Sequence, residues 1–382
     1  AKGMMLNMKC LIDEFGFVPN GNRVYYLNRS QPPLLTWCVH AYWMATGDLE
    51  FVKLALPTLR RELSFFDAHR TVCLPSLHRP LYRYKVTAEG PRPESYREDV
   101  ESARYLTDDE SRRILWGDIA AAAESGRDFS SRWMDSMAMG MEKTRTSNVV
   151  PVDLNSIICG NFRYLSEMYA ACGETKEAED MMRRHGEMKD DIKEVFWNET
   201  EGCWFDFDLR VHSHIKEFFD TNFFPLFTRS FHSDLKSDQI VDYLKRVGAL
   251  SFPGGVPSSL ILSGQQWDFP NAWAPTTWII HEGLVAIGET STAFSIANKW
   301  LRRNYSSWKS SGGQMYEKYD VSSDCSRQFA KGGEYEVQEG FAWTNAVVID
   351  LLVQYSDRIE SPKEEECPCV ECVQNKENVI PQ

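Results

Sequence analysis

Residues 266–275 read QWDFPNAWAP and lead into residues 277–288, where apolar residues recur at the spacing of an α-helix. Nine further segments share this periodicity: 3–15, 34–45, 49–68, 113–123, 154–171, 174–196, 234–247, 291–303 and 339–355. The alternation typical of β-strands is scarce. The sequence therefore predicts an all-α protein.

Long loops rich in Pro, Gly and Asn separate many of these helices. They include PNGNRVYYLNRSQPP, TAEGPRPES, SFPGGVPSS and FAKGGEYEVQ. Helices joined by long polar loops are typical of a toroid of helical hairpins, in which the loops at one end line a pocket and carry function. A helical solenoid is the competing layout, but the sequence has no repeat of fixed period. We expect one domain over residues 1–355 and a flexible, cysteine-containing tail over residues 356–382.

Composition argues against several classes of partner. The 382 residues carry a net charge of −13, and no stretch gathers Lys and Arg into the basic face that nucleic acid binding requires. The longest apolar runs are shorter than the ~20 residues of a membrane span. The sequons at Asn28, Asn198 and Asn304 favour a secreted or cell-surface protein, although no signal or anchor is visible.

The ten cysteines are interpreted mainly as small buried hydrophobic residues. Three of them, Cys367, Cys369 and Cys372, form the CPCVEC motif of the tail. This motif could bind a soft metal or form a disulfide, but it lacks paired CxxC spacing and has no His nearby. We expect neither a metal nor a cofactor.

Three loop carboxylates have surroundings suited to acid–base chemistry. Asp128 lies in ESGRDFSSRW, Glu317 lies between tyrosines in QMYEKYD, and Glu334 follows two glycines in KGGEYEVQEG. Partial desolvation could raise the pKa of Glu317, and glycines allow a loop to fold tightly over a ligand. Alternatives stay open: a helix cap or arginine pair for Asp128, a solvated charge for Glu317, and an ordinary Gly-rich loop for Glu334.

Two arginines lie in loops bounded by proline, Arg29 in NRSQPP and Arg92 in GPRPES. With Asn20, Gln31 and Glu94 they offer the fixed donors and acceptors that vicinal sugar hydroxyls require. Surface salt bridges are the alternative. The chain has no phosphate-binding Gly-rich loop, nucleophile elbow or HExxH helix, which argues against kinases, esterases and zinc proteases.

Taken together, these strings resemble the motifs of the trehalase family. QWDFPNAWAP (266–275) resembles the family signature, and GGEYEVQEGFAWTN (332–345) resembles its Gly-rich motif. PNGNRVYYLNRSQPP, GPRPESYREDVE, AAESGRDFSSRW, VVPVDLN and EKYDV occur in the family's order, so the resemblance spans about residues 3–355. It implies an (α/α)6 toroid that hydrolyses the α,α-1,1 bond of trehalose with inversion, giving two glucose molecules.

The resemblance also implies residue roles. Asp128 stands at the position of the general acid and Glu317 at that of the base that activates water. Trp267 and Asp268 are expected to wall the pocket, and Glu334 matches the carboxylate of the loop that closes over the sugar. The matched substrate-binding positions are Asn20, Arg29, Ser30, Gln31, Arg92, Pro93, Glu94 and Gly126. A glycan on Asn28 would conflict with Arg29 and Ser30, so we expect that sequon to be unused.

The sequence departs from the family pattern at several points. It begins after the position of the family's first motif, PGGRFxExYYWDSY, so we expect a toroid incomplete at the N-terminus. Arg127 stands where the family commonly has Trp, and its charge could lower the pKa of Asp128. The Gly-rich loop is shortened, and Ala342 and Ala346 replace glycines, so the loop could be stiffer.

Three hypotheses follow from this combination. The first is an active trehalase or a catalytic fragment of one, with trehalose as its substrate and no cofactor. The second is a trehalase-like sugar-binding or regulatory protein that is catalytically impaired. The third is another toroidal glucosidase acting on α-glucans, which fits the motif set less well.

Overall fold

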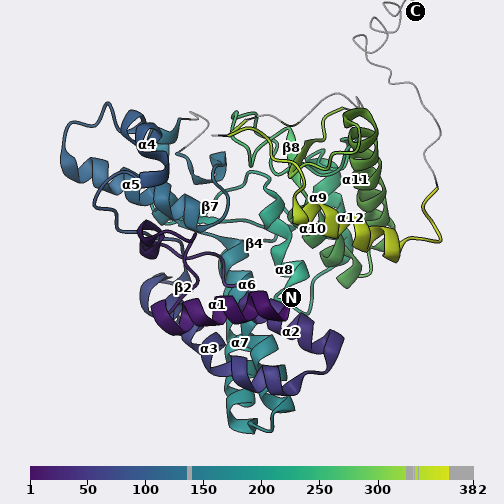
Figure 1. The fold of residues 1–382 in the computed structure, drawn as a ribbon, viewed down its shortest axis with the longest axis horizontal. Helices are drawn as coiled ribbons and strands as arrows, with labels where there is room; N and C mark the ends of the chain where they lie inside the picture. The colour runs from purple at the N-terminus through teal and green to yellow at the C-terminus, as the bar shows by residue number, and fades with distance from the viewer. Residues whose placement is uncertain (136–139, 324–329, 331, 334, 361–382) are drawn as a thin grey trace, which may run out of the picture. The chain divides into compact units, whose positions relative to one another are not determined.

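The computed structural model describes residues 1–135, 140–323, 330, 332, 333 and 335–360 (Figure 1). These residues fold into two compact units. The first unit consists of residues 1–216 and 228–235, and the second of residues 217–227 and the described residues from 236 onward. The single domain over residues 1–355 stays a prediction. Most of the predicted tail, including its three cysteines, lies outside the described residues.

All ten helices predicted from periodicity are confirmed. They are α1 (Lys2–Phe15), α2 (Leu35–Thr46), α3 (Leu49–His69), α5 (Asp109–Glu124), α6 (Val152–Ala171), α7 (Thr175–Phe196), α9 (Ser237–Arg246), α10 (Ala274–Ala286), α11 (Thr290–Ser311) and α12 (Ala342–Gln354). Two short helices were not predicted: α4 (Tyr96–Ser102) and α8 (Phe224–Phe227). Each is shorter than the window of about 11–18 residues in which the apolar pattern of a helix can be recognised.

The strands of the described residues are only two or three residues long and pair antiparallel. They are β1 (Thr71–Val72), β2 (Leu81–Tyr82), β3 (Val149–Val150), β4 (Trp197–Asn198), β5 (Cys203–Trp204), β6 (Phe207–Asp208), β7 (Ser213–His214), β8 (Asn271–Trp273) and β9 (Lys318–Asp320). The sheets are β1–β2, β3–β6–β7, β4–β5 and β8–β9, and two of the pairings, β3–β6 and β8–β9, join segments far apart in the sequence. Short 3₁₀ turns lie at Val24–Asn28, Pro93–Ser95, Ser131–Trp133, Met141–Lys143, Thr146–Asn148 and Asp220–Phe223. The all-α class is therefore confirmed.

In the first unit the long hairpin of α6 and α7 packs against α2 and α3 through α6 (Figure 1). Gly160 of α6 makes the close approach to α2 feasible, because a Cβ there would lie 2.2 Å from the Trp37 ring. The turn between α2 and α3 is built locally. Gly47 ends α2 with φ +71°, and the Asp48 carboxylate caps α3 by accepting from the Phe51 amide at 3.0 Å.

Glu62 is a buried carboxyl on the core-facing side of α3. It is only 2% exposed, and its Oε2 has no hydrogen-bond partner among the described residues. Burial raises the pKa of Glu62 to about 8. The folded state therefore keeps a proton that the unfolded chain releases above its ordinary pKa, and stability is lost as the pH rises from that value toward 8.

We expect this group to make the protein less stable at pH 7 than at pH 5, by about 2–3 kcal/mol. The Glu62→Gln variant should lose that part of the pH dependence, because it has no proton to release. Denaturant unfolding at the two pH values measures the difference. Glu50→Gln on the same helix is the control, since the Glu50 side chain is 85% exposed. An equal pH dependence in wild type and Glu62→Gln would show that Glu62 is ionised in the folded protein.

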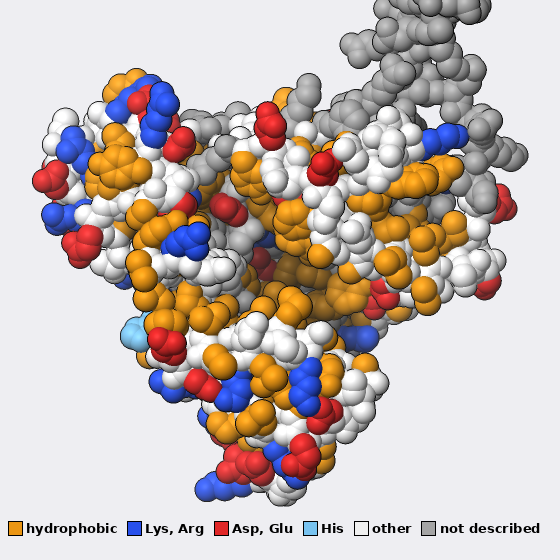
Figure 2. Space-filling view, in the orientation of Figure 1, with side chains coloured by type: hydrophobic (Ala, Val, Ile, Leu, Met, Phe, Trp, Pro, Cys, Tyr) orange, Lys and Arg blue, Asp and Glu red, His pale blue; other side chains and the backbone are white. Residues whose placement is uncertain are grey.

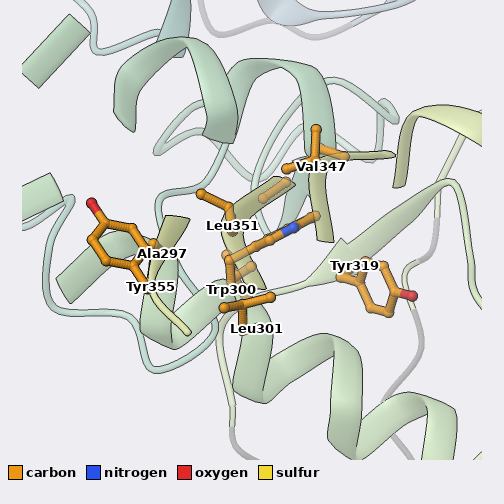
Figure 3. Close-up of a cluster of buried hydrophobic side chains, with 10 residues drawn as sticks. Ala297, Trp300, Leu301, Tyr319, Val347, Leu351 and Tyr355 are labelled. Carbon is orange, nitrogen blue, oxygen red and sulfur yellow. The ribbon is translucent and has the colours of Figure 1, made fainter. Parts of the chain in front are cut away.

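The second unit is centred on α10, which packs against α8, α11 and α12 (Figure 1). Trp300 of α11 and Leu351 of α12 are fully buried in its core, together with Tyr319 of β9 (Figure 3). The other buried members are Ala272, Ala274, Ala297, Leu301, Val321, Val347 and Tyr355. Strand β8 leads directly into α10, and its partner β9 runs through this core. The core therefore fixes the β8–β9 pair.

Charged side chains of both signs are mixed on the surface drawn in Figure 2. On the face drawn in Figure 2, Lys and Arg side chains lie among Asp and Glu side chains and form no continuous basic patch. The absence of a nucleic acid partner stays a prediction. None of the helices formed by the described residues is both long enough and apolar enough to cross a membrane.

The three sequons differ in accessibility. Asn28 is exposed, whereas the Asn198 amide group contacts His214 at 3.1 Å and accepts from the Glu201 amide at 3.0 Å. Asn304 is 1% exposed and donates to the Trp300 carbonyl at 2.8 Å. A glycan on Asn304 would require this part of α11 to open. Secretion therefore stays a prediction that the sequons alone do not decide.

Candidate active site

The loop before α2 brings four of the predicted binding residues together in the first unit. The Asn20 amide donates to the Arg29 carbonyl at 3.0 Å and closes the loop around the 3₁₀ turn. The Asn20 side chain donates to the carbonyls of Ser30 at 3.1 Å and Ala123 at 3.2 Å, so the loop is fastened to the end of α5. Gln31 donates to the Asn20 carbonyl at 3.2 Å.

Arg29 lies at the centre of this loop with a fully buried guanidinium. Its Nε donates to Asn20 Oδ1 at 3.2 Å, and its Nη2 pairs with Glu94. Its Nη1 has no hydrogen-bond partner among the described residues. A buried donor without a partner costs about 1–3 kcal/mol or more, so this nitrogen is suited to a ligand oxygen.

Ser30 is held by Glu124, which the sequence did not single out. Glu124 Oε1 accepts from the Ser30 amide at 2.8 Å and from its hydroxyl at 2.9 Å. Arg70 holds the same carboxylate, with Nη2 at 2.6 Å and Nε at 2.9 Å. Glu124 is fully buried at the end of α5 and precedes Gly126. Its position inside ESGRDFSSRW is the signal that could have found it.

Arg92 is oriented by Asp99 of α4. Its Nη2 and Nε donate to Asp99 at 2.7 and 3.0 Å, and its backbone amide donates at 2.8 Å. The guanidinium also lies 4.9 Å from the Phe129 ring centre, next to the predicted acid. Of its neighbours, Pro93 begins a 3₁₀ turn and is exposed, and Glu94 pairs with Arg29. The two arginines therefore belong to one region of the first unit.

Asp128 follows the end of α5, where the chain turns at Gly126 with φ +74°. A Cβ at Gly126 would lie 3.7 Å from Gln31 Oε1, so the turn runs beside the binding loop. Asp128 is half-buried between the buried residues Arg127 and Phe129. The N-cap of the next turn, Ser131–Trp133, is Ser130, so the helix-cap alternative for Asp128 is wrong.

Arg127 is 6% exposed, and its Nε lies 3.9 Å from Asp153. Burial by itself would raise the pKa of Asp153, but Arg132, with Arg127 adding to it, holds that pKa below its usual value. Arg127, at the position where the family commonly has Trp, therefore also acts on the buried Asp153. An effect of Arg127 on the pKa of Asp128 stays a prediction.

A second buried ionic cluster, also missed from the sequence, lies under this segment. Arg132 is 1% exposed, and its guanidinium donates to Asp153 at 2.7 and 2.8 Å and to Asp206 at 2.6 and 2.9 Å. Asp206 also accepts from the Val152 amide at 2.9 Å, at the start of α6. Arg132 thereby fastens the turn after Asp128 to α6. Arg132 and Asp153 lie in ESGRDFSSRW and VVPVDLN, strings that the sequence did mark.

Glu317, in the second unit, immediately precedes β9 and is 1% exposed. The Gln338 amide donates to its Oε1 at 3.3 Å, and the Tyr335 hydroxyl donates to its Oε2 at 3.4 Å. Its backbone amide donates to the Gln338 carbonyl at 3.0 Å. Burial raises the pKa of Glu317, opposed by the Gln338 amide and Lys318. A buried carboxyl with a raised pKa is suited to taking up a proton, so the solvated-charge alternative is wrong.

Trp267 and Asp268 lie in a buried loop before β8. The Trp267 ring stacks on Trp273 with 4.0 Å between ring centres. The Asp268 carboxylate accepts from Ser259 at 2.8 Å and from Ser263, so it organises this loop. A role in walling the pocket stays a prediction for both residues.

The Gly-rich segment packs on the same loop. A Cβ at Gly332 would lie 2.5 Å from the Gly264 carbonyl oxygen, and one at Gly333 would lie 2.6 Å from Gln266 Oε1. Both glycines also have positive φ, +88° and +95°. Only glycine fits at these positions. The predicted ligand carboxylate, Glu334, lies outside the described residues.

No metal centre is indicated in the part of the chain that the structure describes. Within residues 1–135, 140–323, 330, 332, 333 and 335–360, no three His, Cys, Asp or Glu side chains gather as metal ligands. The first unit offers the half-buried Asp128 and a cluster of arginine, amide and hydroxyl groups, and the second unit by itself offers the buried Glu317 carboxyl. These groups suit proton transfer to and from a neutral polar ligand.

Comparisons with known proteins agree with these motifs. The family model described as Trehalase matches residues 1–356. A trehalase of Pimpla hypochondriaca is 42% identical over 366 residues, which cover 93% of this chain and 62% of that protein. A human trehalase is 42% identical over 367 residues, covering 94% of this chain and 62% of that protein. The chain thus spans less than two thirds of these relatives.

Solved structures give the same fold. The neutral trehalase of Saccharomyces cerevisiae superimposes with a TM-score of 0.70 at 20% identity, covering 92% of this chain and 67% of that one. A mannosylglycerate hydrolase of Thermus thermophilus gives a TM-score of 0.54 at 17% identity, covering 86% and 76%. Both are toroidal enzymes, so the predicted all-α toroid fold is confirmed.

Proposed function

Because the chain belongs to the trehalase family, we propose that it hydrolyses the α,α-1,1-glycosidic bond of trehalose to two glucose molecules, with inversion. The match of the family model over residues 1–356 carries this proposal. The retained Asp128 and Glu317 support catalysis, and the buried cluster around Arg29 supports sugar binding.

The reaction needs one carboxylic acid and one carboxylate. Asp128 donates its proton to the glycosidic oxygen as the bond between that oxygen and the anomeric carbon breaks. Glu317 accepts a proton from the water whose oxygen attacks the same carbon from the opposite face. One α-glucose leaves and one β-glucose forms. Inversion requires the two carboxyls to be about 6.5–9.5 Å apart, so that the water fits between them.

Arg29 is proposed to bind a sugar hydroxyl through Nη1, the nitrogen without a partner among the described residues. Asn20 and Glu94 hold the other two guanidinium nitrogens, so the donor is aimed before the ligand arrives. Ser30 and Gln31 extend the same hydrogen-bonding surface. A preorganised donor loses little entropy on binding, which favours affinity for a polyol.

We expect Arg29→Lys to weaken trehalose binding about 10- to 100-fold, because lysine cannot donate to Asn20, Glu94 and the sugar from one planar group. Titration calorimetry with trehalose measures the affinity, and thermal unfolding shows whether the variant is folded. The matched control is Arg23→Lys in the same loop. Arg23 is exposed and donates to the Asn22 carbonyl at 3.2 Å. Equal affinity in wild type and Arg29→Lys would remove Arg29 from the binding site.

Glucose release from trehalose by the purified protein tests the activity itself. A second candidate function, a sugar-binding protein without catalysis, is favoured by Arg127, whose charge lies next to the proposed acid. In that case trehalose binds in calorimetry and no glucose appears. Faster turnover of maltose than of trehalose would instead favour a glucosidase acting on α-glucans.

A further inference from the structure

Lys318 is a buried cation that the proposed mechanism does not use. It is the first residue of β9 and 1% exposed. Its Nζ donates to the Gly332 carbonyl at 2.8 Å and lies 5.5 Å from the ring centre of Trp273, its partner in the β8–β9 register. Burying an ammonium group is costly unless it is paired, so its retention next to Glu317 calls for an explanation.

We propose that Lys318 is a positioning residue for Glu317: it ties the Gly-rich segment to β9 and, by its charge, favours the ionised form of the neighbouring carboxyl. The inference rests on the proposed function, in which Glu317 is the base. It adds a residue that acts through Glu317 without touching the substrate.

Lys318 supports Glu317 mechanically. Trp343 donates to the Glu317 carbonyl at 3.0 Å, and Gln338 exchanges hydrogen bonds with the Glu317 backbone and carboxylate. The residues that hold Glu317 therefore follow the glycines in sequence. Lys318 fastens the glycine end of this stretch through Gly332. Without the Lys318 side chain, the stretch that holds Glu317 would keep its contact at Trp343 and lose its attachment at Gly332.

Lys318 also acts on Glu317 through its charge. Burial raises the pKa of Glu317, and the charge of Lys318 opposes that rise. Burial lowers the pKa of Lys318 to about 8, opposed by Glu317. Among the described residues, the Gln338 amide and the Tyr335 hydroxyl also donate to this carboxylate, and both lower its pKa. A base must be ionised to act, so removing the lysine charge raises the pH at which Glu317 begins to work.

Three substitutions at Lys318 separate the tether from the charge. Lys318→Met removes both, Lys318→Gln keeps a donor for Gly332 without the charge, and Lys318→Arg keeps both. A ¹³C NMR titration of labelled glutamate, with Glu317→Gln identifying the signal, measures the pKa of Glu317 directly. We expect Met and Gln to raise that pKa by on the order of 1 unit and Arg to leave it near the wild-type value.

The pH dependence of turnover should change in the same variants as the pKa of Glu317. The acid limb of kcat/KM for trehalose should move to higher pH in the Met and Gln variants, and kcat should fall more in Met than in Gln. Lys299→Met is the matched control, because Lys299 donates to the carbonyls of Leu250 at 2.6 Å and Phe252 at 3.0 Å, likewise in the second unit. It should leave the acid limb in place.

An unchanged pKa of Glu317 in Lys318→Gln would overturn the inference, as would an equal shift in Lys299→Met. The NMR titration does not depend on turnover, so it tests Lys318 even if no glucose is released. If Lys318→Met does not fold, the Gln and Arg variants still compare an uncharged with a charged side chain at this position. Wild-type activity in Glu317→Gln would instead contradict the proposed base and leave the titration result intact.

Discussion

Replacing Glu317 with glutamine is expected to lower kcat/KM for trehalose by about 10²- to 10⁴-fold. The amide keeps the size of the side chain but cannot take a proton from water. Steady-state glucose release measures the effect. The control is Glu339→Gln, an exposed position whose backbone pairs with Tyr316, and this variant should retain activity.

The Asp128→Asn substitution should lower kcat/KM for trehalose by a similar factor. Hydrolysis of α-glucosyl fluoride then distinguishes the general acid from the general base. Fluoride leaves without a proton, so the variant lacking the acid should recover activity on this substrate. The variant lacking the base should not recover, because water must still be activated. Recovery of Glu317→Gln and not of Asp128→Asn would reverse the two assignments.

Arg132→Met is expected to destabilise the protein by about 3–5 kcal/mol. The substitution leaves Asp153 and Asp206, at 5% and 1% exposure, buried without the arginine that bridges them, and Asp153 keeps a more distant cation, Arg127 at 3.9 Å. Both carboxylates now accept two hydrogen bonds from the guanidinium. Denaturant unfolding of wild type and variant measures the change in the free energy of unfolding.

Arg183→Met supplies the matched control for this prediction. Arg183 also pairs with two carboxylates, those of Asp180 and Glu187, but its side chain is 58% exposed on α7. Exposed pairs of this kind contribute little, about 0–1 kcal/mol. If both substitutions cost the same, the Arg132 cluster contributes no more than a surface ion pair.

The fold was predictable from the sequence where helices are long. Each of the ten periodic segments became a helix, because an apolar face of several turns leaves a clear pattern. Helices α4 and α8 were missed because they are short. Their formation depends on contacts outside the helix itself, such as the packing of α8 on α10 and the pairing of Asp99 of α4 with Arg92. The division of the chain into two compact units left no signal in composition.

The candidate site was predictable only in part. Sequence motifs indicate which segments carry functional residues, but they do not show which side chains contact one another. The loop residues Asn20, Arg29, Ser30 and Gln31 do come together as expected. Glu124 was missed because its partners lie far away in sequence, and burial is what makes it important. Periodicity and spacing carry no information on such pairs, which form only when helices pack.

The missed buried charges share this cause. Arg132 meets Asp206 from 74 residues away, and Lys318 reaches Gly332 from 14 residues away. In the sequence each reads as an ordinary surface charge. Strings that the sequence marked for other reasons contain both, so a search for every charged residue inside those motifs would have found them.

The most direct test of the proposed function is ¹H NMR of the first glucose formed from trehalose, before mutarotation mixes the anomers. Inverting hydrolysis predicts equal amounts of α- and β-glucose, because the leaving sugar keeps its configuration and the attacked one changes. Release of α-glucose alone would contradict inversion and the roles of Asp128 and Glu317. No glucose from a folded protein that binds trehalose would contradict catalysis itself.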